Sequence, residues 1–262
     1  MGGRIHRVAC TGKGFLVGVG TVTLPLLHLD EQLVVVGKPS GLLVHRSAIA
    51  TEASEFALQS VRDQLGKHVY PVHRLDRATS GALLMALDVE SARILSAQFQ
   101  AGTVEKTYLA VVRGSPKAQF TVDHPLKEEL DRKADRLARA DKPAQDAVTD
   151  FNTLNQIEFA VQVDKFPTSR YALVEARPRT GRKHQIRRHL AHAGHPIAGD
   201  VEHGSGKHNR FFREMFGVHR LLLACTRLSF DHPRTGDRLT VPAPLSPDFA
   251  ALLVEMGWSA HV

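Results

Sequence analysis

Short apolar runs that end at glycine or proline constrain the fold of this sequence more than any other feature. LVVV at 33–36 stops at a GKPSG segment, and ALLMAL at 82–87 follows a Thr-Ser-Gly turn. TYLAVVRG at 107–114 and RYALVEARP at 170–178 have the same character. Short runs rich in β-branched residues and bounded by turn residues are typical of strands. The chain is therefore expected to build a β-sheet.

Amphipathic segments between these runs predict helices. The segments 54–66 and 88–102 begin at the N-cap residues Ser54 and Asp88, and both end at a glycine. Further helices are expected at 181–194 and 246–256, and further strands at DFNTL (150–154), FAVQVD (159–164) and 221–228. Strands and helices mix without a regular βαβ alternation, and the sequence shows no internal repeat. The prediction is an α+β fold with a mixed, largely antiparallel sheet and flanking helices.

The charge balance indicates an anionic partner. Lysine and arginine number 34 against 27 acidic residues, which gives a net charge of +7 and a pI near 9.6. Such a surface favours nucleic acid as the partner. The two cysteines, far apart in sequence, fit a reducing cytoplasm, and no apolar stretch reaches the roughly 18 residues of a membrane-spanning helix.

Two segments depart from this pattern. Residues 1–25 resemble a signal peptide superficially but lack a small-residue cleavage site, so we expect a disordered extension or a misplaced start before a single domain at 26–262. Residues 127–147 are densely charged and contain a proline, which predicts an exposed, partly helical insertion.

Asp76 is the first candidate for chemistry. It lies between Arg74 and Arg77 in HRLDRATSG, and cationic neighbours favour the charged form of a carboxylate. A surface salt bridge would give the same pattern. An apolar residue before Asp76 and the apolar run from Ala82 to Leu87 suggest, however, that the loop is anchored against the core. Asp76 is therefore a candidate for nucleophilic attack or proton transfer.

A second candidate region, at 179–188, is strongly basic, which is typical of a phosphate-binding surface. Its cations are Arg179, Arg182, Lys183, Arg187 and Arg188. On a helix that begins near Arg182, His184, Arg187 and Arg188 would share one face and could reach a carboxylate on another loop.

Histidines and a tyrosine complete the candidates. His184, His189, His192 and His195 follow no metal-ligand spacing, so no metal site is expected. Tyr108 follows Lys106 on a predicted strand. Such a tyrosine is commonly a core residue, but at a basic pocket it is also a stacking surface for an extruded base.

Together these stretches resemble the RluA-type pseudouridine synthases. The matching motifs occur in family order and cover the chain from about Leu26 onward. They are GKPSGLLVH (37–45), HRLDRATSGALLM (73–85), KTYLAVVRG (106–114), TGRKHQIRRHL (180–190) and GHPIAGD (194–200). The family fold, a largely antiparallel mixed sheet with a central cleft, agrees with the fold predicted from the residues. The resemblance implies a catalytic domain without a preceding S4-type RNA-binding module.

The resemblance also implies roles for individual residues. Asp76 would attack the target nucleotide while the uracil is detached, turned and rejoined through C5. Tyr108 would stack on the flipped base and assist proton removal from C5. Arg187 would pair with Asp76, and Arg74 would fill the gap left in the RNA stack. The reaction needs no cofactor, because all its atoms come from the substrate.

The RNA substrate and some alternatives remain open at this stage. Similarity to family members that act on tRNA suggests uridine 65, on the T-stem side of the acceptor arm, whereas other members modify ribosomal RNA. The remaining alternatives are a non-catalytic RNA-binding module and a glycosidic hydrolase with Glu175 or Asp200 as its second carboxylate. In each case we expect a monomer that needs no protein partner.

Overall fold

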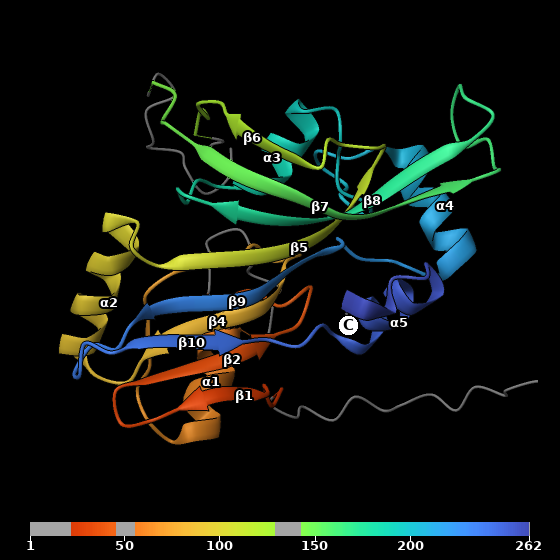
Figure 1. The fold of residues 1–262 in the computed structure, drawn as a ribbon. Helices are drawn as coiled ribbons and strands as arrows, with labels where there is room; N and C mark the ends of the chain where they lie inside the picture. The colour runs from red at the N-terminus through yellow and green to blue at the C-terminus, as the bar shows by residue number, and fades with distance from the viewer. Residues whose placement is uncertain (1–21, 46–55, 129–142, 262) are drawn as a thin grey trace, which may run out of the picture.

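One sheet forms the centre of the structure (Figure 1). The computed structural model describes residues 22–45, 56–128 and 143–261, and the statements below concern these residues. Their strands are β1 (Leu26–Leu29), β2 (Leu33–Lys38), β3 (Tyr70–Pro71), β4 (Ser80–Ala86), β5 (Glu105–Arg113), β6 (Gln119–Asp123), β7 (Val148–Phe159), β8 (Ser169–Pro178), β9 (Leu223–Asp231) and β10 (Arg238–Pro242). Along the sheet the order is β1-β2-β4-β9-β5-β8-β7-β6, with β10 added to β9 and β3 to β4.

The sheet is largely antiparallel, as predicted. Its strand pairs run antiparallel except for β4 and β9, which run parallel over a short register. β5 lies between β9 and β8 and so joins β1, β2 and β4 on one side to β6, β7 and β8 on the other. Figure 1 shows these two parts as the lower and upper halves of the twisted sheet. Every residue of β4 is buried, which explains its unbroken apolar run.

Helices flank the sheet. They are α1 (Ala57–Leu65), α2 (Val89–Ala101), α3 (Gln185–His192), α4 (Gly206–Phe216) and α5 (Pro247–Glu255), followed by the short 3-10 helix η1 (Ser259–His261). α2 packs against β3, β4 and β9, and α3 packs against β7 and β8. As predicted, Asp88 caps α2 by accepting a 2.8 Å hydrogen bond from the Ser91 N–H. None of the described helices is long and apolar enough to cross a membrane.

Several local predictions are wrong or fall outside the described residues. FAVQVD is not a strand after Phe159: β7 ends there and the chain turns through bends before β8. The basic helix begins at Gln185, later than predicted, and α4 was not predicted at all. The expected extension falls largely on residues 1–21, the Ser54 cap on 46–55 and most of the charged insertion on 129–142, which all lie outside the described residues.

Gly81 is required where β4 meets β9. Its φ is +109°, and a Cβ there would lie 2.1 Å from the Cys225 carbonyl oxygen. We therefore expect Gly81→Ala to lower the free energy of unfolding by more than about 3 kcal/mol, because strain and overpacking add. Gly66→Ala is the control: φ is +62° but nothing lies within 4 Å of the added Cβ, so about 1 kcal/mol is expected. Urea denaturation measures both variants, and an equal loss of unfolding free energy in the two would refute the steric explanation.

Candidate active site

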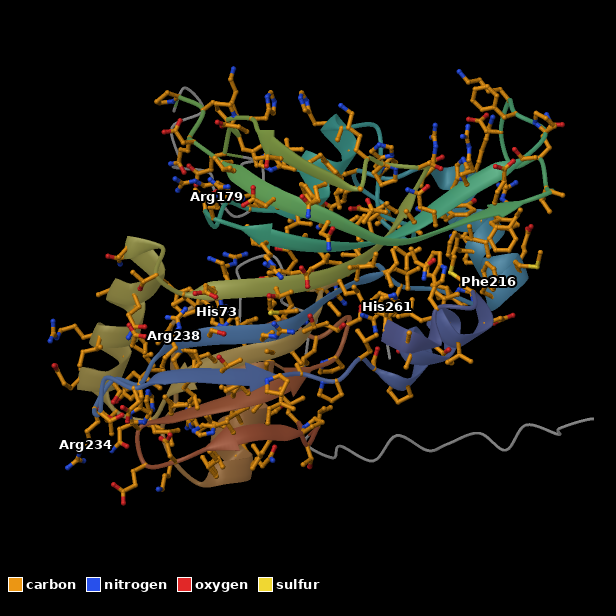
Figure 2. The ribbon with its side chains drawn as sticks, viewed as in Figure 1. His73, Arg179, Phe216, Arg234, Arg238 and His261 are labelled. Carbon is orange, nitrogen blue, oxygen red and sulfur yellow. The ribbon has the colours of Figure 1, made fainter. Side chains whose placement is uncertain are left out.

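A cleft of about 820 Å³ lies between the loop before β4, the end of α2 and the segment that leads into α3. Asp76 and Tyr108 line it, as does the whole segment 178–187. Figure 2 shows His73 and Arg179 on the two sides of this region. Its size is that of a site for a small molecule or a single extruded nucleotide.

The loop that carries Asp76 is tightly held. The Asp76 carbonyl accepts a 3.1 Å hydrogen bond from the Thr79 N–H, which closes a turn. Leu75, beside Asp76, is 5% exposed and anchors the loop in the core. The GKPSG segment pairs with the same loop, because the Gly41 N–H donates to the Arg77 carbonyl at 2.8 Å. The Asp76 side chain, 22% exposed, therefore projects from a fixed backbone.

Lys38 is a part of this support that the sequence analysis missed. It is only 1% exposed, and its ammonium donates to the carbonyls of Pro39, Leu42 and Arg77 at 2.8, 2.7 and 3.1 Å. Burial lowers the pKa of Lys38 to about 7, against the opposing charge of Asp76. The lysine of the GKPSG motif thus joins that motif to the loop of Asp76.

Arg187 joins Asp76 to a second acid, Asp200. Its guanidinium lies 3.6 Å from Asp76 and donates two hydrogen bonds to Asp200, at 2.7 and 2.8 Å. Arg187 and Asp200 are 3% and 2% exposed. Burial opposes the charge on Arg187, but Asp200 and Asp76 raise its pKa above the usual value. The predicted Arg187–Asp76 pair is present, and Asp200 orients its arginine.

His184 also faces Asp76, but not from the predicted helix face. It precedes α3 with a left-handed φ of 54°, and its Nε2 lies 4.0 Å from an Asp76 oxygen. Arg188 points elsewhere and donates to the Lys127 carbonyl at 2.9 Å. His184 and Arg187 thus reach one carboxylate on another loop, as predicted, but Arg188 does not, so the predicted common face of all three is wrong.

Tyr108 lies in β5 where the register against β9 shifts, and its ring lines the cleft. It is 9% exposed. Burial, followed by the nearby Cys225 and the charge of Asp76, raises the pKa of Tyr108 well above 10. Tyr108 therefore presents a neutral phenol ring to the cleft at neutral pH.

The two arginines beside Asp76 in sequence do not pair with it in the described residues. Arg74 is exposed and lines the cleft. Arg77 is exposed outside it, and its Nε donates to the Gly41 carbonyl at 3.0 Å. Neighbouring side chains in a turn diverge, so the cation that pairs with Asp76 is Arg187 of α3. The imidazole of His184, whose pKa is lowered by burial, lies 4.0 Å from Asp76.

Basic side chains form one rim of the cleft. Arg179 forms two hydrogen bonds with Asp150, at 2.6 and 2.9 Å. Arg182 donates to the Asp146 carbonyl at 3.1 Å, and Lys183 is exposed beside it. All three cations line the cleft as predicted. We call Arg179, Arg182 and Lys183 the basic rim.

The remaining histidines that the sequence suggested do not gather at the cleft. His189 bonds to Thr149 and to a backbone carbonyl, His195 faces the Arg113 carbonyl, and His192 stacks on His124. Instead, His184 lies beside Glu202 and His203, a grouping that sequence reasoning missed. The signal for it was His203, three residues after the end of the GHPIAGD motif.

Known proteins resemble this chain over most of its length. The family model described as RNA pseudouridylate synthase matches residues 32–192. A protein of Vibrio cholerae named tRNA pseudouridine synthase C is 49% identical over 235 residues, which cover 90% of this chain and 96% of that protein. The protein of the same name from Pasteurella multocida is 46% identical over 240 residues, 92% of this chain and 99% of its own.

The fold also resembles a solved structure. Human RNA Pseudouridylate Synthase Domain Containing 1 superimposes with a TM-score of 0.67 at 22% identity, covering 90% of both chains. This likeness concerns the fold, and it agrees with the mixed, largely antiparallel sheet.

Proposed function

This chain belongs to the RNA pseudouridylate synthase family, and we propose that it isomerises uridine 65 of tRNA to pseudouridine with Asp76 as the nucleophile. Relatives that are 46–49% identical over nine-tenths of the chain bear the name of a tRNA pseudouridine synthase, an isomerase. The observation that carries the assignment of Asp76 is its position in the cleft, 3.6 Å from a buried arginine.

The chemistry is a rearrangement within one nucleotide. The glycosidic bond from C1′ to N1 breaks, the uracil turns, and a new bond forms from C1′ to C5. The proton leaves C5, and N1 gains a proton, so nothing is consumed. Asp76 bonds to C1′ as the bond to N1 breaks, and this bond to Asp76 breaks again when C5 bonds to C1′. Arg187, 3.6 Å away, directs the carboxylate into the cleft.

Tyr108 and Arg74 handle the flipped base in this proposal. The raised pKa of Tyr108 keeps the phenol protonated at neutral pH, which supports stacking on the uracil more directly than proton removal from C5. Arg74 is exposed at the cleft and fills the gap in the RNA stack. Flipping costs roughly a few kcal/mol, which phosphate contacts at the basic rim offset.

The surroundings of Asp200 and Glu175 argue against the hydrolase alternative. A hydrolase would need a second available carboxylate, but Asp200 is held by Arg187, and Glu175 pairs with Arg177 at 2.8 Å and does not line the cleft. We also infer that the chain works on tRNA in the cytoplasm, as a monomer with a single domain from residue 26 onward, and the tRNA enzymes among its relatives support the substrate and the compartment.

The position of the modified uridine is tested by mapping. Unmodified tRNA transcripts are incubated with the protein, treated with a carbodiimide that marks pseudouridine, and read by primer extension. A single new stop at uridine 65 is expected. A stop at another uridine would refute the assigned position, and stops only in ribosomal RNA would favour the ribosomal alternative.

The basic rim predicts the salt dependence of binding. Arg182→Ala and Lys183→Ala should each weaken tRNA binding and reduce the slope of log affinity against log salt by about 1, because each removes one phosphate contact. Arg234→Ala is the matched control, since that arginine is exposed in the turn before β10 and does not line the cleft; Figure 2 shows it apart from His73 and Arg179. Slopes measured by filter binding that match the wild type would exclude the rim from the RNA interface.

A further inference from the structure

Three metal-binding side chains converge beside the cleft, and the geometry points to a Zn²⁺ site formed by His184, Glu202 and His203. Nδ1 of His184 lies 3.0 Å from Nε2 of His203 and 3.3 Å from a Glu202 carboxylate oxygen. The same oxygen lies 3.9 Å from Nε2 of His203. The three atoms thus form a compact triangle from two segments of the chain.

Two of these separations are close to those in the ligand shell of zinc. Ligands at about 2.0–2.1 Å from a tetrahedral ion lie about 3.3 Å apart, near the 3.0 and 3.3 Å found, and the 3.9 Å between Glu202 and His203 is longer. Two imidazoles and one carboxylate are also a common ligand set for zinc in sites that keep an open fourth position. Magnesium, which prefers an octahedral shell of oxygen ligands, does not fit this set.

The surrounding structure holds the ligands in place. One oxygen of Asp200 accepts hydrogen bonds from the backbone N–H groups of Glu202 and His203, both at 3.0 Å. Among the described residues that are not glycine, His184 is the one with a positive φ. Its backbone is therefore held in a strained conformation. The side chains of His184 and His203 are 11% and 17% exposed, and that of Glu202 is 54% exposed. An ion can therefore enter from the side of Glu202.

Nε2, the other ring nitrogen of His184, links the proposed zinc site to Asp76. With zinc on Nδ1, Nε2 carries the proton and faces the Asp76 carboxylate, 4.0 Å away. This separation is longer than a hydrogen bond, so the bound ion acts on Asp76 by adding positive charge beside it. Zinc therefore inhibits the isomerase, an effect that rests on the proposed role of Asp76.

Binding is tested without RNA, using Co²⁺ as a spectroscopic probe of the same site. One Co²⁺ per chain should give the visible absorption of a four- or five-coordinate ion, and Zn²⁺ but not Mg²⁺ should displace it. His203→Ala, and independently Glu202→Gln, should weaken binding roughly tenfold or more. His192→Ala removes an exposed imidazole of α3 outside the site and should change nothing. Unchanged binding in both ligand variants, or no such absorption in the wild type, overturns the site.

Inhibition is tested on the intact enzyme with tRNA. Wild-type turnover should fall over the Zn²⁺ concentrations at which the ion binds, whereas His203→Ala should keep its turnover there. Zinc binding to wild type without loss of turnover would overturn the inhibitory effect. A metal-free wild type that never isomerises RNA would instead refute the proposed function, and the Co²⁺ result would still decide the site.

Discussion

Asp76→Asn is expected to reduce isomerisation of tRNA by roughly 10⁴-fold or more, the scale seen when a nucleophile is removed from an enzyme. The amide keeps the shape of the side chain and its place in a fixed turn, but it cannot attack the nucleotide. Affinity for tRNA should change little, since we propose that the basic rim makes the phosphate contacts. Single-turnover rates and filter binding on the same transcripts measure the two quantities separately.

Asp63→Asn provides the control for this substitution. Asp63 is exposed on α1 and does not line the cleft, so the same chemical change there should leave both rate and affinity unaltered. Normal turnover in Asp76→Asn would show that another group attacks the nucleotide. An equal loss of affinity and rate would make Asp76 a binding residue.

Asp200→Asn is expected to lower the free energy of unfolding by about 3–5 kcal/mol at neutral pH and to slow turnover. The substitution leaves the buried Arg187 guanidinium without the carboxylate that accepts both of its hydrogen bonds, and removing one member of a buried pair costs about this much. Turnover falls because Arg187 then loses its fixed direction toward Asp76. Urea denaturation at several pH values measures the loss.

The pH dependence has a definite sign. Burial opposes the charge on Asp200, but hydrogen bonds from Arg187 and backbone N–H groups lower its pKa below 3.8. The pair therefore stabilises the fold fully above about pH 4, and this contribution disappears as the pH falls through the lowered pKa. The difference in stability between wild type and Asp200→Asn should shrink in acid.

Asp150→Asn is the matched control for burial. Asp150 and Arg179 form the same two-fold hydrogen bond, but their side chains are 34% and 65% exposed. An exposed pair of this kind contributes about 1 kcal/mol or less. Equal losses in Asp150→Asn and Asp200→Asn would contradict the importance of burial.

Much of the fold could be predicted from local pattern. The runs that became β4, β5 and β8 are apolar, short and bounded by turn residues, and Asp88 caps α2 as its residue type predicts. The prediction of a strand at FAVQVD was wrong, because the segment has the composition of a strand although the chain turns there. α4 was missed although Phe211 and Phe212 are buried on it, because its basic residues obscured the apolar face.

The residues of the site could be predicted, as could the Arg187–Asp76 pair that the family resemblance implied, but the other contacts could not. Asp76, Tyr108, Arg187 and the basic rim all line one cleft, as their sequence motifs suggested. Asp200 holds Arg187, and Lys38 is buried under the loop of Asp76. Both arrangements depend on contacts between distant segments. Local sequence carries no signal for such contacts. The expectation that Arg74 and Arg77 are the cationic neighbours of Asp76 was wrong for the same reason, since residues adjacent in sequence need not be in contact in a turn.

The central claim is that this chain isomerises uridine in tRNA, and release of tritium from C5 of labelled uridine tests it most directly. The proton leaves C5 when the new bond from C1′ forms, so each conversion liberates one tritium. Wild-type protein should release tritium from unmodified tRNA up to one equivalent per molecule, and much less from ribosomal RNA fragments. Tight binding to tRNA with no release from either RNA would contradict the account and leave an RNA-binding protein without this activity.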